Sequence, residues 1–206
     1  MKKIELALFI LFLMLFISCD NDNEDEVPLT LTDNIELYEA DFISDDYIFV
    51  VENSSTNSYL INKQGDKLYN WIFDTTSGND LEILNNGNIL GLFKAANPSI
   101  DFGGFGGTAK IIDQTNNTTW EYTVSDNNFI AHHDIEMLPN GNVLMMIWER
   151  INNETAVNNG VDFETDIFTE KIIEVNPSSN EIVWEWRSWD HIIQDKFESL
   201  INYGDV

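Results

Sequence analysis

Residues 80–90 read DLEILNNGNIL, and residues 134–144 read DIEMLPNGNVL, so one pattern occurs twice in this chain. In each copy apolar and polar residues alternate, an Asn-Gly pair follows, and a second apolar segment begins. Alternation places successive side chains on opposite faces and predicts a β-strand. Asn-Gly suits a type I′ turn, whose two central residues both need positive φ. Each copy is therefore predicted to be a β-hairpin.

A second element recurs in the same chain. It reads LINKQGDKLYNWIF at 60–73, IIDQTNNTTWEYT at 111–123 and IEVNPSSNEIVWEWR at 173–187. Each copy is a strand, a polar turn and a strand with two aromatic residues one position apart. Because residues i and i+2 share a face of a strand, each aromatic pair should form a layer for a neighbouring sheet. The pairs are Tyr69 with Trp71, Trp120 with Tyr122, and Trp184 with Trp186.

The two elements together make a four-stranded antiparallel unit of the size of a propeller blade. We expect one blade over 78–123 and another over 131–187, the second enlarged by a loop at 151–164. Residues 47–73 supply three strands of an incomplete blade. The sequence thus predicts an all-β fold, a β-propeller of which about three blades are present.

Closed propellers need at least four blades, so we expect the sequence to be truncated. A complete two-sheet β-sandwich is the alternative, and the blade-length repeat favours the propeller. Helix signals are sparse. Residues 189–201 have apolar residues near helical spacing, and Asp190 could cap a short helix there.

The N-terminus is typical of an exported lipoprotein. Lys2 and Lys3 precede an apolar run at 6–17, which is too short for a bilayer span of about 20 residues. Cys19, the only cysteine in the chain, lies where a lipobox places its lipidated residue. We therefore expect a lipoprotein signal peptide over 1–18 and a lipid anchor at Cys19.

The segment after Cys19 is acidic and reads DNDNEDE at 20–26. Low hydrophobicity with high charge predicts a solvated tether, which we place at 19–40, followed by the partial propeller at 41–206. A calcium loop is the alternative, but its glycine and closing glutamate are missing. The expected location is the outer membrane, facing the periplasm or the cell surface.

The net charge of −26 bears on possible partners. Phosphate binding relies on Lys and Arg, and only Arg150 and Arg187 represent arginine in this chain. The composition therefore excludes nucleic acid as an expected partner.

The two hairpin copies differ just ahead of their shared aspartate. The first has Gly78-Asn79 and the second has His132-His133. The common frame serves the fold, so the histidine pair is additional to it. The first strand of a blade lines the central channel of a propeller, and its start lies near one mouth. We therefore interpret His132 and His133 as site residues, against the alternative that they are polar residues at a strand end.

Other candidates are weaker. His191 follows Asp190, and a packing role is an equal alternative to a site role.

Adjacent histidines on a regular strand point to opposite faces, and zinc-type spacings are absent, so no metal site is expected. Asp134 and Glu136 share a face, but Asp80 and Glu82 occupy the same positions in the first copy, which favours a structural role. The glycine-rich run 103–107 precedes a strand, not a helix, and predicts a tight loop at the channel rim.

The stretches AHHDIEMLPNGNVLMMIWER at 131–150 and KIIEVNPSSNEIVWEWRSWDHIIQD at 171–195 resemble the bacterial aryl-sulfate sulfotransferase (arylsulfotransferase) family. The similarity extends over most of 42–206. The resemblance implies a six-bladed propeller with histidines converging on the channel and no cofactor. In the family, an aryl sulfate gives its sulfuryl group to one histidine, which is transiently sulfated. The group then passes from this histidine to a phenol.

On this resemblance His132 and His133 contact the substrate or assist proton transfer, and Arg150 and His191 are less certain substrate-binding residues. The sulfated histidine of the family lies in later blades, so the chain as given is expected to lack the nucleophile. A non-catalytic, surface-anchored propeller that binds a ligand is the alternative function.

Overall fold

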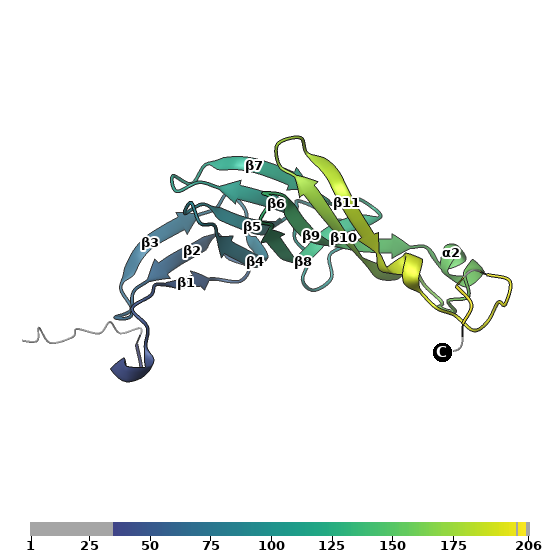
Figure 1. The fold of residues 1–206 in the computed structure, drawn as a ribbon, viewed down its shortest axis with the longest axis horizontal. Coiled ribbons are helices and arrows are strands. Elements are labelled where there is room, and N and C mark those ends of the chain that lie inside the picture. The colour runs from purple at the N-terminus through teal and green to yellow at the C-terminus, as the bar shows by residue number, and fades with distance from the viewer. Residues whose placement is uncertain (1–34, 201, 205–206) are drawn as a thin grey trace, which may run out of the picture.

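The computed structural model describes residues 35–200 and 202–204. They form three antiparallel sheets in succession along the chain (Figure 1). We call these sheets blades 1, 2 and 3. Blade 1 contains β1 (Ile48–Val51), β2 (Asn57–Ile61) and β3 (Lys67–Ile72). Blade 2 contains β4 (Ser77–Ile83), β5 (Ile89–Lys94), β6 (Gly107–Ile112) and β7 (Thr118–Thr123). Blade 3 contains β8 (Phe129–Met137), β9 (Val143–Ile151), β10 (Ile167–Asn176) and β11 (Glu181–Arg187).

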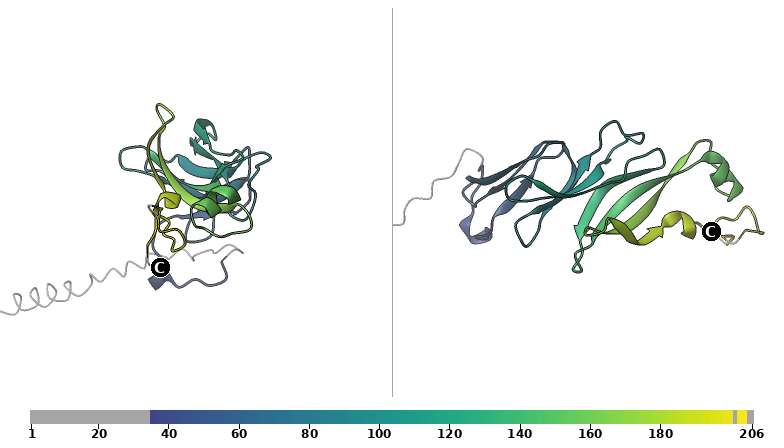
Figure 2. Two further views of the ribbon diagram at one scale, coloured as in Figure 1. Left: turned by 90° about the vertical axis from the view of Figure 1, so that its right-hand side faces the viewer. Right: turned by 90° about the horizontal axis from the view of Figure 1, so that it is seen from above.

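Blades 2 and 3 have the same strand order, each strand pairing with the next one along the chain. The predicted blades at 78–123 and 131–187, and the three strands within 47–73, are confirmed. The sheets follow one another in an arc, with β1, β4 and β8 on its concave side and β3, β7 and β11 on its convex side (Figure 1). Figure 2 shows the same succession of sheets from above. The fold is all-β, a partial propeller, and the described residues form no closed ring.

The turns inside the repeated hairpins differ from the prediction. Gly87 and Gly141 have φ of 80° and 84°, but the preceding Asn86 and Asn140 are not in the positive-φ region. Gly87 N donates to Leu84 O at 2.8 Å. Each turn is thus a type I turn followed by a left-handed glycine, not a type I′ turn. The cause is the asparagine side chain: Asn86 Oδ1 accepts from Asn88 N at 3.0 Å, and Asn140 Oδ1 accepts from the equivalent Asn142 N at 2.9 Å.

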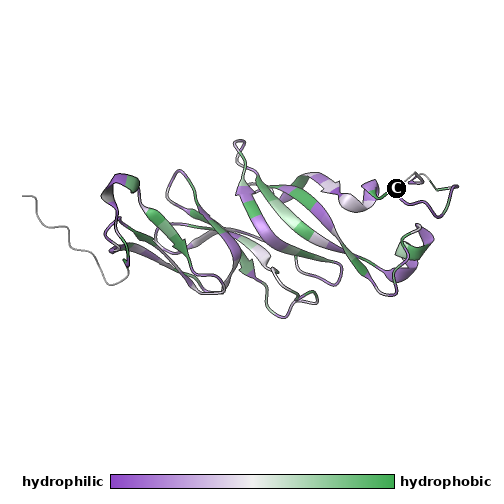
Figure 3. Ribbon diagram, turned by 90° about the horizontal axis from the view of Figure 1, so that it is seen from below, coloured by the Kyte–Doolittle hydropathy of each residue, from purple (hydrophilic) through white to green (hydrophobic). Residues whose placement is uncertain are grey.

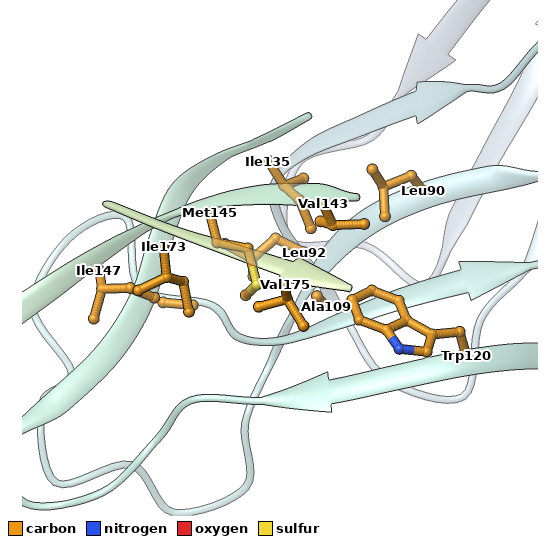
Figure 4. Packing of buried hydrophobic residues seen from close by; sticks show 11 residues of the cluster. Leu90, Leu92, Ala109, Trp120, Ile135, Val143, Met145, Ile147, Ile173 and Val175 are labelled. Atoms are coloured by element: carbon orange, nitrogen blue, oxygen red, sulfur yellow. The ribbon is translucent and has the colours of Figure 1, made fainter. Parts of the chain in front are cut away.

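The main core lies between blades 2 and 3. Leu92, Ala109 and Trp120 of blade 2 meet Met145 and Val175 of blade 3, all buried (Figure 4). The second strands β5 and β9 are apolar along most of their length and largely buried, and Figure 3 shows by colour where hydrophobic and hydrophilic residues lie along the chain. Burial of apolar surface contributes a stabilising free energy of roughly 25 cal/mol per Å². Packing between blades therefore stabilises the fold in a way that a single sheet cannot.

The convex edges of neighbouring blades are joined by a repeated contact. Asn116 and Asn180 are left-handed residues, with φ of 64° and 58°, in the turns before β7 and β11. Asn116 Oδ1 accepts from Ile72 N of blade 1 at 2.9 Å, and Asn180 Oδ1 accepts from Trp120 Nε1 of blade 2 at 2.8 Å. The aromatic layer is thus confirmed at Trp71 and Trp120, which are buried.

The concave edges are joined by carboxylates. Glu82 Oε1 of β4 accepts from Met137 N of β8 at 2.9 Å, and Asp80 Oδ2 accepts from Ile135 N at 3.4 Å. These backbone donors lie on the edge of β8 that faces away from β9 and would otherwise have no strand partner. The equivalent carboxylates of blade 2, Asp80 and Glu82, thus have a structural role, and the structural role favoured for Asp134 and Glu136 stays a prediction.

Helices are short. α2 (Asn153–Asn158) lies in the predicted loop 151–164, and Asn152 caps it by accepting from Thr155 N. The 3₁₀ helix η2 covers Ala40–Phe42, and η3 covers Ser188–His191. In the part of the chain that the structure covers, no helix has the length and apolar character needed to cross a bilayer.

The helix predicted over 189–201 is wrong for residues 192–200, which follow η3. Gln194 causes the difference. Its buried side chain accepts from Lys196 N and Phe197 N, both at 2.8 Å, and its backbone N donates to Asn202 O at 3.0 Å. These bonds close a loop at the position where the helix would continue.

The signal peptide at 1–18 and Cys19 lie outside the described residues, as does most of the tether at 19–40. The division of the chain into these segments stays a prediction.

Candidate functional site

The start of β8 contains a bulge. Ala131 pairs with Ile147 and Ile135 pairs with Met145, so residues 132–134 face a single residue of β9. A bulge bends the strand and redirects the side chains that it contains. The two histidines of β8 thus lie where the regular alternation of the strand is interrupted.

The same bulge occurs in blade 2, where Ser77 pairs with Phe93 and Leu81 pairs with Gly91. There the bulged residues are 78–80, with the sequence Gly-Asn-Asp in place of His-His-Asp. The backbone irregularity therefore belongs to the repeat, and the imidazoles are specific to blade 3, as the comparison of the two hairpins predicted.

The two imidazoles contact each other directly. His132 Nδ1 and His133 Nδ1 are 2.8 Å apart, and the ring planes are perpendicular. The expectation that the rings point to opposite faces is wrong, because the bulge replaces the regular strand and His133 has φ of 52°. A non-glycine residue in this left-handed region costs about 1–3 kcal/mol, and such strain clusters at functional sites.

His132 is held in the interior. Its side chain is 2% exposed, its ring stacks on Trp148 at 4.0 Å, and its Nε2 lies 2.8 Å from Glu170 Oε2. Burial lowers the pKa of His132, and the Glu170 carboxylate opposes this shift only in part. A lowered pKa favours the neutral imidazole near neutral pH.

Glu170 is itself fixed from two sides. Its second carboxylate oxygen, Oε1, accepts from Trp148 Nε1 at 3.2 Å, and its backbone N donates to Ser188 Oγ at 3.0 Å. Trp148 and Glu170 are partners in the register of β9 and β10. The carboxylate thus reaches His132 from a strand two positions away in the sheet.

His133 is exposed and lies against a loop of the preceding blade. His133 N donates to Gly104 O at 3.0 Å, and Asn79 Nδ2 donates to the same oxygen at 3.0 Å. Gly104 has φ of 91°, and a Cβ added to it would overlap Cε1 and Nε2 of His133. The glycine-rich loop between β5 and β6 therefore borders the imidazole, and a side chain at position 104 would collide with Cε1 and Nε2.

Arg150 lies on the same blade, two residues after Trp148 on β9. It pairs with Phe168 in the sheet register, and its guanidinium carbon is 5.4 Å from the centre of that ring. Phe102, from the loop after β5, contacts both Phe168 and Trp148, at 4.8 Å and 4.1 Å between ring centres. Trp148 in turn contacts His132 and His133, so aromatic rings connect Arg150 with the imidazole pair.

The two arginines differ in their partners. Arg187 binds the buried Glu149 carboxylate through two nitrogens, at 2.9 Å and 2.6 Å. Arg150 has no carboxylate partner among residues 35–200 and 202–204; its NH2 donates to Ser99 O at 3.4 Å. The charge of Arg150 is therefore available for an anion, whereas that of Arg187 is neutralised.

A family model described as Arylsulfotransferase (ASST) matches residues 80–205. The chain belongs to the arylsulfotransferase family. The match covers more than half of the sequence and includes blades 2 and 3 with the histidine bulge. A search of curated proteins finds no match. The family relation predicted from the sequence is thus confirmed.

His191 does not join the imidazole pair of this arylsulfotransferase-family chain. It is exposed in η3, and its ring stacks on Trp186 of the outermost strand at 5.2 Å between ring centres. This stacking is a packing contact, which is the alternative role that the sequence left open for His191.

Two hollows between blades 2 and 3 lie away from the histidines. One, of about 620 Å³, is bordered by the turns at 82–86 and 137–141. The other, of about 310 Å³, is bordered by Phe129, Lys171 and the segment 122–126. No group of three or more His, Cys, Asp or Glu within the described part of the chain is arranged to hold a metal ion.

Sequence reasoning missed Glu170 and Trp148. Both lie on strands whose residues alternate between two faces, and nothing local distinguishes Glu170 from Glu174 on the same strand. The only signal would have been the pairing of β9 with β10, which places these two side chains opposite each other.

Proposed function

We propose that this chain takes part in sulfuryl transfer from an aryl sulfate to a phenol, with His133 as the group that moves the proton. The observation that supports this role is the exposed His133 imidazole, whose Nδ1 lies 2.8 Å from the buried His132 imidazole. Membership of the arylsulfotransferase family supports the reaction class.

The overall transfer breaks the bond between sulfur and the donor oxygen and forms a bond between sulfur and the acceptor oxygen. The acceptor hydroxyl loses a proton, and the donor oxygen gains one. A neutral imidazole with a reference pKa of about 6.5 can accept the first proton and deliver it to the second oxygen. His133 is proposed for this exchange, whether or not a second histidine carries the sulfuryl group between the two half-reactions.

The negative net charge requires a local cation for an anionic substrate. Arg150 is proposed to hold the sulfuryl oxygens, because no carboxylate within the described residues neutralises its guanidinium. The aromatic rings of Phe102 and Phe168 lie beside it and suit the ring of an aryl sulfate.

The test is release of p-nitrophenol from p-nitrophenyl sulfate in the presence of phenol, with the full chain and its His133→Gln variant. We expect the variant to lose about 10²-fold or more in kcat, the usual contribution of acid–base catalysis. His191→Gln, which removes the imidazole stacked on Trp186, should change kcat by less than about threefold, since a surface substitution of this kind has a small effect.

Equal turnover by the parent chain and His133→Gln would contradict the proposal. Binding of p-nitrophenyl sulfate without turnover would instead favour a non-catalytic surface module, the alternative that the sequence left open.

We also propose that the protein is exported and anchored through a lipid on Cys19, facing the periplasm or the cell surface. The support is the sequence of residues 1–19 alone. A Cys19→Ser variant should leave the membrane fraction of expressing cells, and its retention there would contradict the anchor.

A further inference from the structure

Glu170, His132 and His133 form a chain of hydrogen-bonding groups across blade 3. Glu170 Oε2 lies 2.8 Å from His132 Nε2, and His132 Nδ1 lies 2.8 Å from His133 Nδ1. Both separations are hydrogen-bond distances. Each link needs one proton, so the protonation of one group determines that of the next.

The carboxylate sets the direction of this chain. An ionised carboxylate only accepts, so His132 Nε2 carries a proton and donates it to Glu170. A neutral imidazole has one N–H, so His132 Nδ1 is an acceptor, and His133 Nδ1 must then be the donor. The remaining nitrogen, His133 Nε2, has a free lone pair.

The surroundings of His132 favour its neutral form, on which this assignment depends. The ring is buried against Trp148, and burial lowers its pKa. A cationic His132 would donate from both nitrogens and reverse the link to His133. The other charged residues on the elements around the pair are Asp80 and Glu82 of β4, Asp134 and Glu136 of β8, Glu149 and Arg150 of β9, Lys171 and Glu174 of β10, and Asp101 in the loop after β5.

We infer that Glu170 is a positioning residue that acts through His132 to hold His133 in its Nδ1–H tautomer. This inference rests on the proposed function for its role in catalysis. Glu170 touches no reacting atom. It makes His133 Nε2 the atom that accepts the proton of the acceptor phenol.

The hydrogen-bonded series of Glu170, His132 and His133 also stabilises the product of that step. When the phenol O–H bond breaks and the proton binds His133 Nε2, the ring becomes a cation that still donates from Nδ1 to His132. The carboxylate beyond His132 interacts favourably with this positive charge. The phenol oxygen gives its electron pair to sulfur while the bond between sulfur and its donor breaks, so no oxidant, reductant or further co-reactant enters the step.

Glu170→Gln is the decisive substitution, because Trp148 dictates how the new amide lies. The Trp148 indole can only donate, so the amide oxygen turns towards Trp148 Nε1 and the NH₂ group turns towards His132. His132 Nε2 must then accept, so its proton moves to Nδ1, and His133 Nδ1 becomes an acceptor. The variant should therefore carry the opposite tautomer at both histidines.

The readout is the ¹⁵N chemical shift of the imidazole nitrogens in histidine-labelled protein, which distinguishes N–H nitrogens from those with a lone pair. The chain has three histidines, and a His191→Gln background leaves two. We expect His133 Nδ1–H in the parent chain and His133 Nε2–H in Glu170→Gln. Glu174→Gln is the matched control, since Glu174 lies on the same strand and, among the residues that the structure describes, accepts hydrogen bonds only from the side chains of Asn140 and Asn142.

Activity provides the second readout. Glu170→Gln should lower kcat by about 10-fold or more and alter the acid limb of the pH profile with little change in KM, as loss of a positioned base predicts. His133 as Nε2–H in the parent chain, or the same tautomers in both proteins, would overturn the inference. Reversed tautomers without sulfuryl transfer would leave the positioning role intact and count against the proposed function instead.

Discussion

The indole Nε1 of Trp120 in blade 2 donates to Oδ1 of Asn180 in blade 3 at 2.8 Å. The acceptor lies in a left-handed turn residue, and the donor ring is buried in the core between the two blades. The contact thus joins the packing of one blade to the turn geometry of the next.

Trp120→Phe should keep most of the packing and remove this bond. A net hydrogen bond contributes about 1 kcal/mol, so we expect the free energy of unfolding in urea to fall by about that amount or somewhat more. Trp184→Phe is the control, because Trp184 has the equivalent place in blade 3 but is 48% exposed. A larger loss for Trp184→Phe would contradict the assignment.

Arg187→Ala should destabilise the chain strongly. The substitution leaves Glu149, whose side chain is 8% exposed, without its two charge-assisted hydrogen bonds. Removing one partner of a buried pair typically costs about 3–5 kcal/mol; part of Arg187 is solvent-exposed, so we expect the lower end of that range in urea unfolding.

Lys196→Ala removes an exposed pair with Asp162 and should cost at most about 1 kcal/mol. If Arg187→Ala and Lys196→Ala lower the free energy of unfolding by similar amounts, burial of Glu149 does not make its contact with Arg187 more stabilising than an exposed ion pair.

Gly104→Ala should displace His133. The new methyl group would overlap the imidazole at Cε1 and Nε2, and a φ of 91° adds backbone strain of about 1–3 kcal/mol. We expect lower stability and a changed ¹⁵N spectrum of His133. Gly103→Ala is the control one residue earlier, where an added Cβ meets nothing within 4 Å. An unaltered His133 signal in Gly104→Ala would refute the close contact.

Asp80→Asn should stabilise the fold at neutral pH. Burial raises the pKa of Asp80, and the nearby Asp134 and Glu82 add to the shift. A group with a raised folded pKa stabilises the fold only while protonated, so this contribution is lost as pH rises through the folded pKa. Asparagine stays neutral and can still accept from Ile135 N. The gain should therefore be larger at neutral pH than below the unfolded pKa of about 3.9.

Asp113→Asn should show the opposite sign. The backbone N–H of Asn117 and the hydroxyl of Thr115 lower the pKa of Asp113, so its ionised form stabilises the fold above the unfolded pKa of about 3.9. That contribution is present at neutral pH, disappears on acidification, and should be reduced by the substitution. A matching pH dependence for the two variants in urea unfolding would refute both assignments.

The blades could be predicted because their signal is local and occurs twice. Alternation and Asn-Gly define each hairpin, and the aromatic pairs mark each outer strand. The turn type could not be predicted from the dipeptide alone, because the side chain of Asn86 competes for the backbone N–H of Asn88. Local side-chain bonds of this kind have no periodic signature.

The candidate site could be predicted only in part. The exchange of Gly78-Asn79 for His132-His133 was visible, but the bulge that turns the two rings towards each other is a property of strand register. The contribution of Glu170 depends on the pairing of β9 with β10, which joins residues far apart in the sequence. The helix predicted after Asp190 failed because one buried side chain, Gln194, satisfies the backbone groups that a helix would use.

The bond from Met137 N to Glu82 has a consequence for colloidal behaviour. An innermost strand with free N–H groups is a template on which another polypeptide can add by strand pairing, the first step towards fibrous aggregates. Glu82 of β4 accepts from the Met137 donor, Asp80 of β4 and Asp134 of β8 share the Ile135 donor, and these carboxylates bring charge to the same edge. Part of the high acidic content of this chain therefore protects it against edge-to-edge association.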